Sequence, residues 1–194
     1  MHTKQKLKCV NNNLNEHLST LKLFDKNLKN RVIKASSIIV ESLKKGGTIY
    51  WCGNGGSASD SLHLSAELLG RFKKERKPLK SISLAGNPAT LTCIANDFGY
   101  ENVYSRQIEG LGTSKDVLIA ISTSGNSKNI INAIDQAKKK KINVISFLGK
   151  NGGKCRGKAK LDLVINSNST ARIQELHIMI GHIVCDLVEK GMKL

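Results

Sequence analysis

The chain contains no long apolar run and is poor in aromatic residues. Nowhere among its 194 residues is there a run near the ~20 apolar residues that a bilayer-spanning helix requires. The first residues are polar where a signal peptide has its apolar segment, so we expect neither membrane insertion nor secretion. Aromatic side chains make up only 4% of the chain, which argues against a nucleic-acid surface built on base stacking.

Paired cysteines are missing as well. The chain has five cysteines, an odd number, and no two of them are spaced as Cys-x-x-Cys. This argues against a disulfide framework and against a zinc site made of thiolates. We therefore predict a reduced, cytoplasmic protein whose stability comes from its hydrophobic core.

Acidic residues are scarce: 15 Asp and Glu stand against 31 Lys and Arg, for a formal net charge of +16. A basic chain can bind nucleic acid, an anionic membrane or a phosphorylated substrate. Only six of the basic residues are arginine, however, and lysine lacks the planar fork that contacts phosphates and bases in a bidentate way. The lysines are scattered, so we interpret the charge as solvated surface and predict no nucleic-acid partner.

Apolar residues at helical spacing run from about residue 12 to residue 43, without Gly or Pro. The pattern predicts one long helix, or two helices joined near Asp25. We assign residues 1–45 to an N-terminal helical extension with oligomer contacts, and residues 46–194 to the main domain. A helix of this kind can pack on another subunit or cover the sheet of its own chain, and the pattern favours neither.

From residue 48 onward, short apolar runs alternate with helical segments. Strands are expected at residues 48–52, 80–84, 117–121, 143–147 and 161–165. Helices are expected at residues 58–71, 89–96, 102–111, 128–140 and 172–190. Strands of this kind, each followed by a helix, predict an α/β fold with a parallel sheet covered on both faces, as in a three-layer sandwich.

A glycine-rich loop follows the first expected strand: residues 53–58 read Gly-Asn-Gly-Gly-Ser-Ala. Glycines allow close backbone approach, and the helix that follows attracts an anion to its N-terminus. The stretch also fits the dinucleotide pattern G-x-G-x-x-A, which needs an acidic residue after the second strand to hold a ribose. Residues 84–87 read Leu-Ala-Gly-Asn, so a nicotinamide cofactor is not expected.

A second polar loop, residues 122–127, reads Ser-Thr-Ser-Gly-Asn-Ser and lies between a strand and a helix. Hydroxyl and backbone donors at a helix N-terminus can hold a phosphate. No Gly-Lys-Ser/Thr follows, so a nucleoside triphosphate is not indicated. The alternative is a simple helix cap made by Ser124 or Ser127; because one cap needs only one hydroxyl, the pattern favours phosphate.

Two pairs of polar residues lie on expected helices. His63 and Glu67 are four residues apart and share one face, as either a surface pair or part of a site. Gln174 and His182 are eight apart, within an arc of about 80°. His182 lies among apolar residues, where a histidine is usually a core residue with a partner. Together the four could instead bind a metal, since His and Glu are ordinary zinc ligands.

Four segments resemble one known family. These are residues 52–57, 96–99, 121–127 and 172–177, the last reading Arg-Ile-Gln-Glu-Leu-His. They are similar to the sugar isomerase (SIS) domain family and, within it, to the phosphoheptose isomerase family, in order and over nearly the whole chain. The resemblance implies a flavodoxin-like sheet of five parallel strands and a homotetramer whose sites lie between subunits.

The resemblance also implies an activity. The expected reaction converts sedoheptulose 7-phosphate to D-glycero-D-manno-heptose 7-phosphate through an enediol, the first step toward nucleotide-activated heptose for lipopolysaccharide or capsule. A non-catalytic SIS relative that binds the bacterial replication initiator is the alternative. That relative lacks the acid/base pair, whereas this chain has Glu67 and His182.

By matching position, the resemblance assigns roles to individual residues. Glu67 and His182 would be the catalytic acid/base pair, with either one as the carbon base. Zinc, one ion per subunit, would be held by His63, Glu67, Gln174 and His182. Substrate would be contacted by residues of several loops and helices: Asn54, Gly55, Gly56, Ser57, Glu67, Asn96, Asp97, Ser122, Thr123, Ser124, Ser127 and Gln174.

Overall fold

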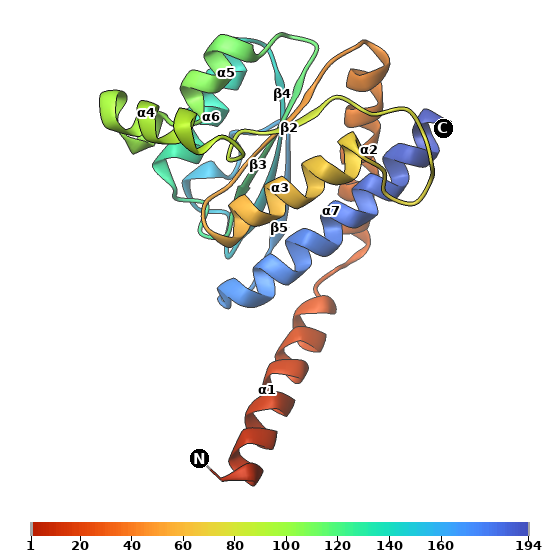
Figure 1. Ribbon diagram of the computed structural model, residues 1–194. Coiled ribbons are helices and arrows are strands. Elements are labelled where there is room, and N and C mark those ends of the chain that lie inside the picture. The colour runs from red at the N-terminus through yellow and green to blue at the C-terminus, as the bar shows by residue number, and fades with distance from the viewer. Residues whose placement is uncertain (1, 194) are drawn as a thin grey trace.

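A computed structural model describes residues 2–193 and shows a five-stranded sheet between two layers of helices, with one helix projecting away (Figure 1). Every strand pair is parallel, and the order is β2-β1-β3-β4-β5, as in flavodoxin-like folds. The predicted fold class is confirmed. The helices are α1 (Thr3–Leu21), α2 (Lys26–Lys44), α3 (Gly56–Leu69), α4 (Pro88–Phe98), α5 (Ser105–Leu111), α6 (Lys128–Lys139) and α7 (Thr170–Met192).

The strands are β1 (Ile49–Cys52), β2 (Ser81–Ser83), β3 (Val117–Ser122), β4 (Asn143–Gly149) and β5 (Leu161–Ile165). The central strands form where apolar residues are continuous, whereas β2 reads Ser-Ile-Ser and β5 includes Asp162. Every residue of β1 and β3 is buried, because both faces of these central strands are covered by helices. The expected strands agree with the structure to within two residues at each end, and β5 coincides with the expected range.

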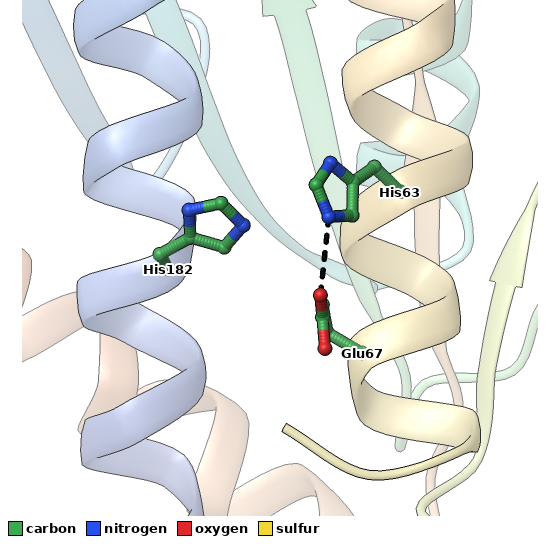
Figure 2. Close-up of side chains that lie close together, drawn as sticks. All are labelled: His63, Glu67 and His182. Atoms are coloured by element: carbon green, nitrogen blue, oxygen red, sulfur yellow. Dashed lines mark hydrogen bonds and ion pairs between the residues drawn. The ribbon is translucent and has the colours of Figure 1, made fainter. Parts of the chain in front are cut away.

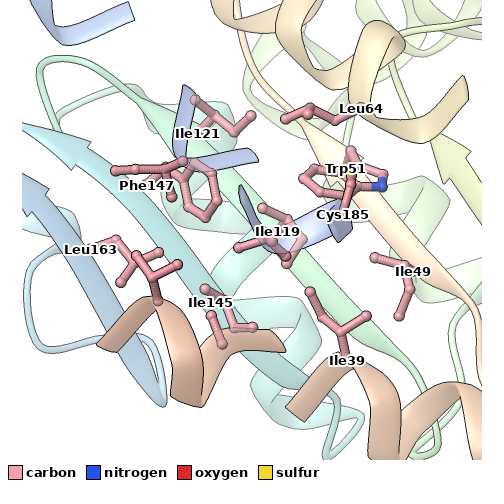
Figure 3. Close-up of a cluster of buried hydrophobic side chains, with 14 of the residues drawn as sticks. Ile39, Ile49, Trp51, Leu64, Ile119, Ile121, Ile145, Phe147, Leu163 and Cys185 are labelled. Atoms are coloured by element: carbon pink, nitrogen blue, oxygen red, sulfur yellow. The ribbon is translucent and has the colours of Figure 1, made fainter. Parts of the chain in front are cut away.

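The two faces of the sheet carry separate cores. Helices α2, α3 and α7 cover one face, where Trp51, Ile119 and Phe147 pack with their apolar residues (Figure 3). Helices α5 and α6 cover the other face, with α4 beside them, and there Tyr50 and Leu118 are buried. Neighbouring strand residues thus point to opposite faces, as the period of a strand requires.

One predicted helix was wrong in its first turn. The range 102–111 contains the end of a short 3-10 turn (Tyr100–Asn102), and α5 begins only at Ser105. Between them the Tyr104 side chain is buried, and its hydroxyl donates to the carbonyl oxygen of Gly53. This contact with a distant loop decides where the helix begins, and local periodicity cannot reveal it.

The N-terminal segment forms two helices joined near Asp25, as one alternative predicted. Asp25 caps α2, because its carboxylate accepts a 2.7 Å hydrogen bond from the backbone N–H of Leu28. Helix α2 packs on α7 and on the sheet of its own chain, whereas α1 projects from the body (Figure 1). The division between residues 45 and 46 stays a prediction. Among residues 2–193, no helix has the length and hydropathy needed to cross a membrane.

Candidate active site

The register of the sheet brings the two polar loops together. Strands β1 and β3 are neighbours, with Cys52 opposite Ala120, so the glycine-rich loop after β1 lies beside the serine loop after β3. Ligands of open parallel sheets bind at this carboxyl edge. The two loops therefore form one candidate site, although Gly53 and Ser122 are 69 positions apart along the chain.

The glycine-rich loop leads into α3 through a backbone that only glycine adopts easily. Gly55 has φ of 56° and ψ of −125°. At Gly53 a Cβ atom would collide with the backbone of Ser57, which is itself buried. At Gly56 a Cβ atom would lie 2.6 Å from Nε2 of Gln174. The loop is therefore packed too tightly for side chains at Gly53 and Gly56.

Asn54 is held by residues that the sequence analysis did not single out. Its amide exchanges two hydrogen bonds with Asn129 of α6, at 2.9 and 2.8 Å. The Tyr100 hydroxyl donates to the same Asn54 oxygen at 3.0 Å, and Tyr104 bonds the adjacent Gly53. Asn129 is buried, but nothing local in the sequence distinguishes a buried Asn on a helix from an exposed one.

The serine loop closes tightly on itself. Gly125 has a positive φ of 64°, and its backbone N–H donates to the Ser122 hydroxyl at 3.1 Å. The Ser124 hydroxyl accepts from Asn126 N–H at 3.1 Å. Ser127 precedes α6, yet its side chain makes no capping hydrogen bond. The simple helix cap is therefore not what the structure shows, and the side chains of Thr123, Ser124 and Ser127 are only partly buried.

Three of the four predicted metal ligands meet between α3 and α7 (Figure 2). His63, Glu67 and His182 each offer one ligand atom within 4.8 Å of the others. His63 Nε2 lies 3.1 Å from Glu67 Oε1, and the two imidazole rings meet edge to face with centroids 5.0 Å apart. The two helices approach closely here because Gly181, one residue before His182, leaves room for Leu64.

Phe72, which the sequence analysis missed, forms one wall of this cluster. Its ring stacks on His182, with centroids 5.5 Å apart and an interplanar angle of 13°. Burial, reinforced by the nearby His63, lowers the pKa of His182, while Glu67 opposes the shift. A lowered pKa favours the neutral imidazole, which can accept a proton or bind a metal ion.

Asp60 lies one turn before His63 on α3 and was also missed. One of its carboxylate oxygens is buried and has no hydrogen-bond partner among the described residues. Burial raises the pKa of Asp60 to about 6, and the nearby His63 opposes part of that shift. The position follows from helical spacing, but its burial depends on how α3 packs.

Gln174 does not lie beside the other three proposed ligands of this chain, which meet further along α3 and α7. Its amide lies against Gly56 at the beginning of α3, and eight residues of α7 separate it from His182, a rise of about 12 Å. Glu67 is likewise eleven residues beyond Gly56, a rise of roughly 16 Å. Gln174 is placed to contact a ligand at the loops, and its role as a metal ligand stays a prediction.

Asn96 and Asp97 lie near the end of α4, and both are exposed. The Asn96 amide donates to Asp97 at 2.8 Å, and the Cys93 thiol lies 3.7 Å from the same carboxylate. The segment after α4 reaches the glycine-rich loop through Tyr100, which bonds Asn54, and Tyr104, which bonds Gly53. Among residues 2–193, no hydrogen bond joins Asn96 or Asp97 to the other predicted site residues.

The fold and the site define the class of protein. A family model for the SIS domain matches residues 14–149, more than half of the chain, so the chain belongs to the SIS domain family. The matched range begins inside α1 and ends with β4. It therefore includes both loops of the site, His63 and Glu67, but not His182.

Within that family, the chain is similar over most of its length to phosphoheptose isomerases. The chain is 46% identical to the phosphoheptose isomerase of a Nitratiruptor species over 185 residues. The matched region covers 95% of this chain and 99% of that relative. With one from Helicobacter pylori, identity is 47% over 174 residues, covering 90% and 91%. The solved phosphoheptose isomerase of Francisella tularensis superposes with a TM-score of 0.92 at 31% identity, covering 95% and 98%.

Proposed function

We propose that this protein interconverts sedoheptulose 7-phosphate and D-glycero-D-manno-heptose 7-phosphate. The observation that carries the proposal is the meeting of Glu67 with His63 and His182 in a chain whose close relatives are phosphoheptose isomerases. The reaction supplies the first intermediate of nucleotide-activated heptose, and we place it in the cytoplasm. Binding of the replication initiator without turnover finds no support among these relatives.

The reaction moves one proton between two carbons and one between two oxygens. A base removes a proton from C1 of the ketose and returns it to C2, through an enediol, while a partner transfers a proton from O1 to O2. We assign the carbon base to Glu67 and the oxygen transfer to His182. A carboxylate can take a proton from carbon, and a neutral imidazole can accept one proton and donate another, so the two groups suit these roles.

The serine loop binds the phosphate of the sugar in this proposal. Ser122, Thr123, Ser124 and Ser127 supply hydroxyl groups, and the beginning of α6 supplies backbone N–H donors and the positive end of the helix dipole. The glycine-rich loop and Gln174 lie next to it and contact the sugar. The phosphate fixes the substrate, and the acid/base cluster performs the chemistry.

The test is NMR of the purified protein with sedoheptulose 7-phosphate in D₂O. Aldose signals should appear, with deuterium at C2, because the base exchanges its proton with solvent. Product without deuterium would keep the isomerase but point to a shielded base or a hydride shift. No product, even with added Zn²⁺, would overturn the proposal.

We also propose that His63, Glu67 and His182 hold a zinc ion, one per subunit. Two imidazoles and a carboxylate whose ligand atoms lie within 4.8 Å of one another match the nitrogen and oxygen ligands that zinc takes. When bound, zinc would polarise the carbonyl of the sugar. Gln174 would complete this ligand set only if its side chain moved from Gly56 or if it came from a neighbouring subunit.

Metal removal tests the zinc proposal. Treatment with a chelator should lower activity, and Zn²⁺, but not Mg²⁺, should restore it, because imidazole ligands suit zinc and not magnesium. Independently of activity, His63→Ala should retain less zinc than the wild type when both are dialysed and their metal content is measured. Full activity after thorough metal removal would leave His63 with a structural role.

We further propose a homotetramer with sites shared between subunits. Helix α1 projects from the body and carries an exposed apolar stripe of Leu7, Val10, Leu14 and Leu18, which association would bury. The distance along α3 between the loops and Glu67 also fits a site to which more than one chain contributes residues.

Light scattering tests the tetramer. The measured mass should be four times the chain mass of 21.2 kDa, and Leu14→Glu should lower the measured mass. A monomeric wild type would refute the tetramer.

A further inference from the structure

A buried ion pair lies behind the acid/base cluster. Arg76 Nε lies 2.8 Å from Glu189 Oε1, and both side chains are only 1% exposed. Arg76 belongs to the segment between α3 and β2, and Glu189 to α7, two turns beyond His182. A buried ion pair is weak evidence for stability, because desolvation offsets much of the attraction. Its contacts point to a different role.

Arg76 binds the end of α3. Its Nη2 donates to the carbonyl oxygen of Glu67 at 2.8 Å. Its Nη1 donates to the carbonyl oxygen of Leu68 at 2.9 Å and lies 3.3 Å from that of Gly70. The last carbonyl groups of a helix have no partner within the helix. The guanidinium therefore fixes the turn of α3 from which the Glu67 side chain extends.

Glu189 binds the segment that follows α3. Its carboxylate accepts from the backbone N–H groups of Phe72 at 3.1 Å and Lys73 at 3.1 Å. Burial alone would raise the pKa of Glu189, but these hydrogen bonds and Arg76 outweigh it, so the pKa lies below its usual value. The carboxylate thus fixes the backbone of Phe72, whose ring stacks on His182.

We propose that Arg76 and Glu189 are positioning residues that set Glu67 and His182 relative to each other. The pair joins α3, the segment carrying Phe72, and α7, and these are the elements that carry the cluster. The inference rests on the proposed isomerase function. It adds two residues that touch neither substrate nor metal but act through the Glu67 carbonyl and the Phe72 ring.

The test compares Arg76→Lys and Phe72→Leu with a control, Lys190→Met. Lysine keeps the charge beside Glu189 but lacks the planar guanidinium, whose three nitrogens reach Glu189, Leu68 and Glu67 at the same time. We expect kcat and Zn²⁺ affinity, the latter from competition with a chelating dye, to fall by about tenfold or more. KM should change little, because the serine loop is untouched. Lys190 adjoins Glu189, but its side chain is exposed and pairs with Asp186, so its variant should behave as wild type.

The proton signals of the His182 ring provide a readout that partial unfolding would not reproduce. Because the Phe72 ring stacks on His182, its ring current should shift these signals in the wild type, and Phe72→Leu should remove that shift. In Arg76→Lys the signals should move toward their Phe72→Leu positions, whereas a partly unfolded population would only weaken every signal. In the double variant the loss of kcat should be smaller than the product of the two single losses, because both changes act partly through the same ring.

Folded Arg76→Lys with wild-type kcat, Zn²⁺ affinity and His182 signals would overturn the inference. If Arg76→Lys does not fold, Glu189→Gln and Phe72→Leu decide it by the same three measurements. A wild type without isomerase activity would refute the proposed function alone. Zn²⁺ affinity and the His182 signals would still decide whether Arg76 and Glu189 position the cluster.

Discussion

Replacing Glu67 with glutamine is expected to lower kcat by about 10²–10⁴-fold, the usual contribution of a general base. Glutamine keeps the shape of the side chain but cannot take a proton from carbon. The protein should remain folded, because Glu67 is partly exposed and its backbone contact with Arg76 does not involve the carboxylate. Initial rates from the NMR assay and a thermal unfolding curve check both parts of the prediction.

A matched control is Glu41→Gln on α2. Glu41 forms an exposed i,i+4 pair with Lys45 at 2.6 Å, on a helix that carries none of the predicted site residues, so this change should leave kcat as it is. If Glu67→Gln instead keeps more than about a tenth of the wild-type rate, the base is elsewhere. His182→Gln would then be the next variant to measure, since the two roles would be exchanged.

Gly125→Ala is expected to disrupt the serine loop. Gly125 has a left-handed φ of 64°, which costs a residue with a Cβ atom about 1–2 kcal/mol. The added methyl group would also lie 2.9 Å from the backbone nitrogen of Gly153 and closer still to the carbonyl of Gly152. Neither backbone can move aside without distorting the loop. We expect a total loss of stability of roughly 2–5 kcal/mol.

The same change should raise KM by about tenfold to a hundredfold, because a displaced loop loses one or more hydrogen bonds to a charged phosphate. Gly46→Ala is the control: Gly46 has a similar φ of 78°, but no atom lies within 4 Å of the added Cβ. It should lose only the backbone part of the stability and keep its KM. Equal effects in the two variants would show that the packing of the serine loop on Gly152 does not matter for binding.

Local patterns in the sequence determined much of the fold. Short apolar runs predicted five strands in a parallel sheet covered on both faces. Such runs indicate this arrangement because a strand that is exposed on one face alternates apolar and polar residues. Helical spacing predicted that His63 and Glu67 share a face, and the structure places them 3.1 Å apart. Loops after β1 and β3 were correctly expected at the carboxyl ends of strands. The strands, the shared helix face and the loops each depend on residues close together in the sequence, so local patterns are enough to predict them.

Only the tertiary structure decided which distant residues meet. The strand order places the two loops side by side, the close packing of α3 on α7 brings His182 to Glu67, and the same packing leaves Gln174 at Gly56. Phe72, Arg76 and Glu189 carry no local signal of these roles, because charged residues are mostly exposed and nothing near Phe72 in the sequence shows that its ring meets His182. Their roles arise from burial between elements more than a hundred residues apart in the sequence, and that burial depends on how the whole chain packs.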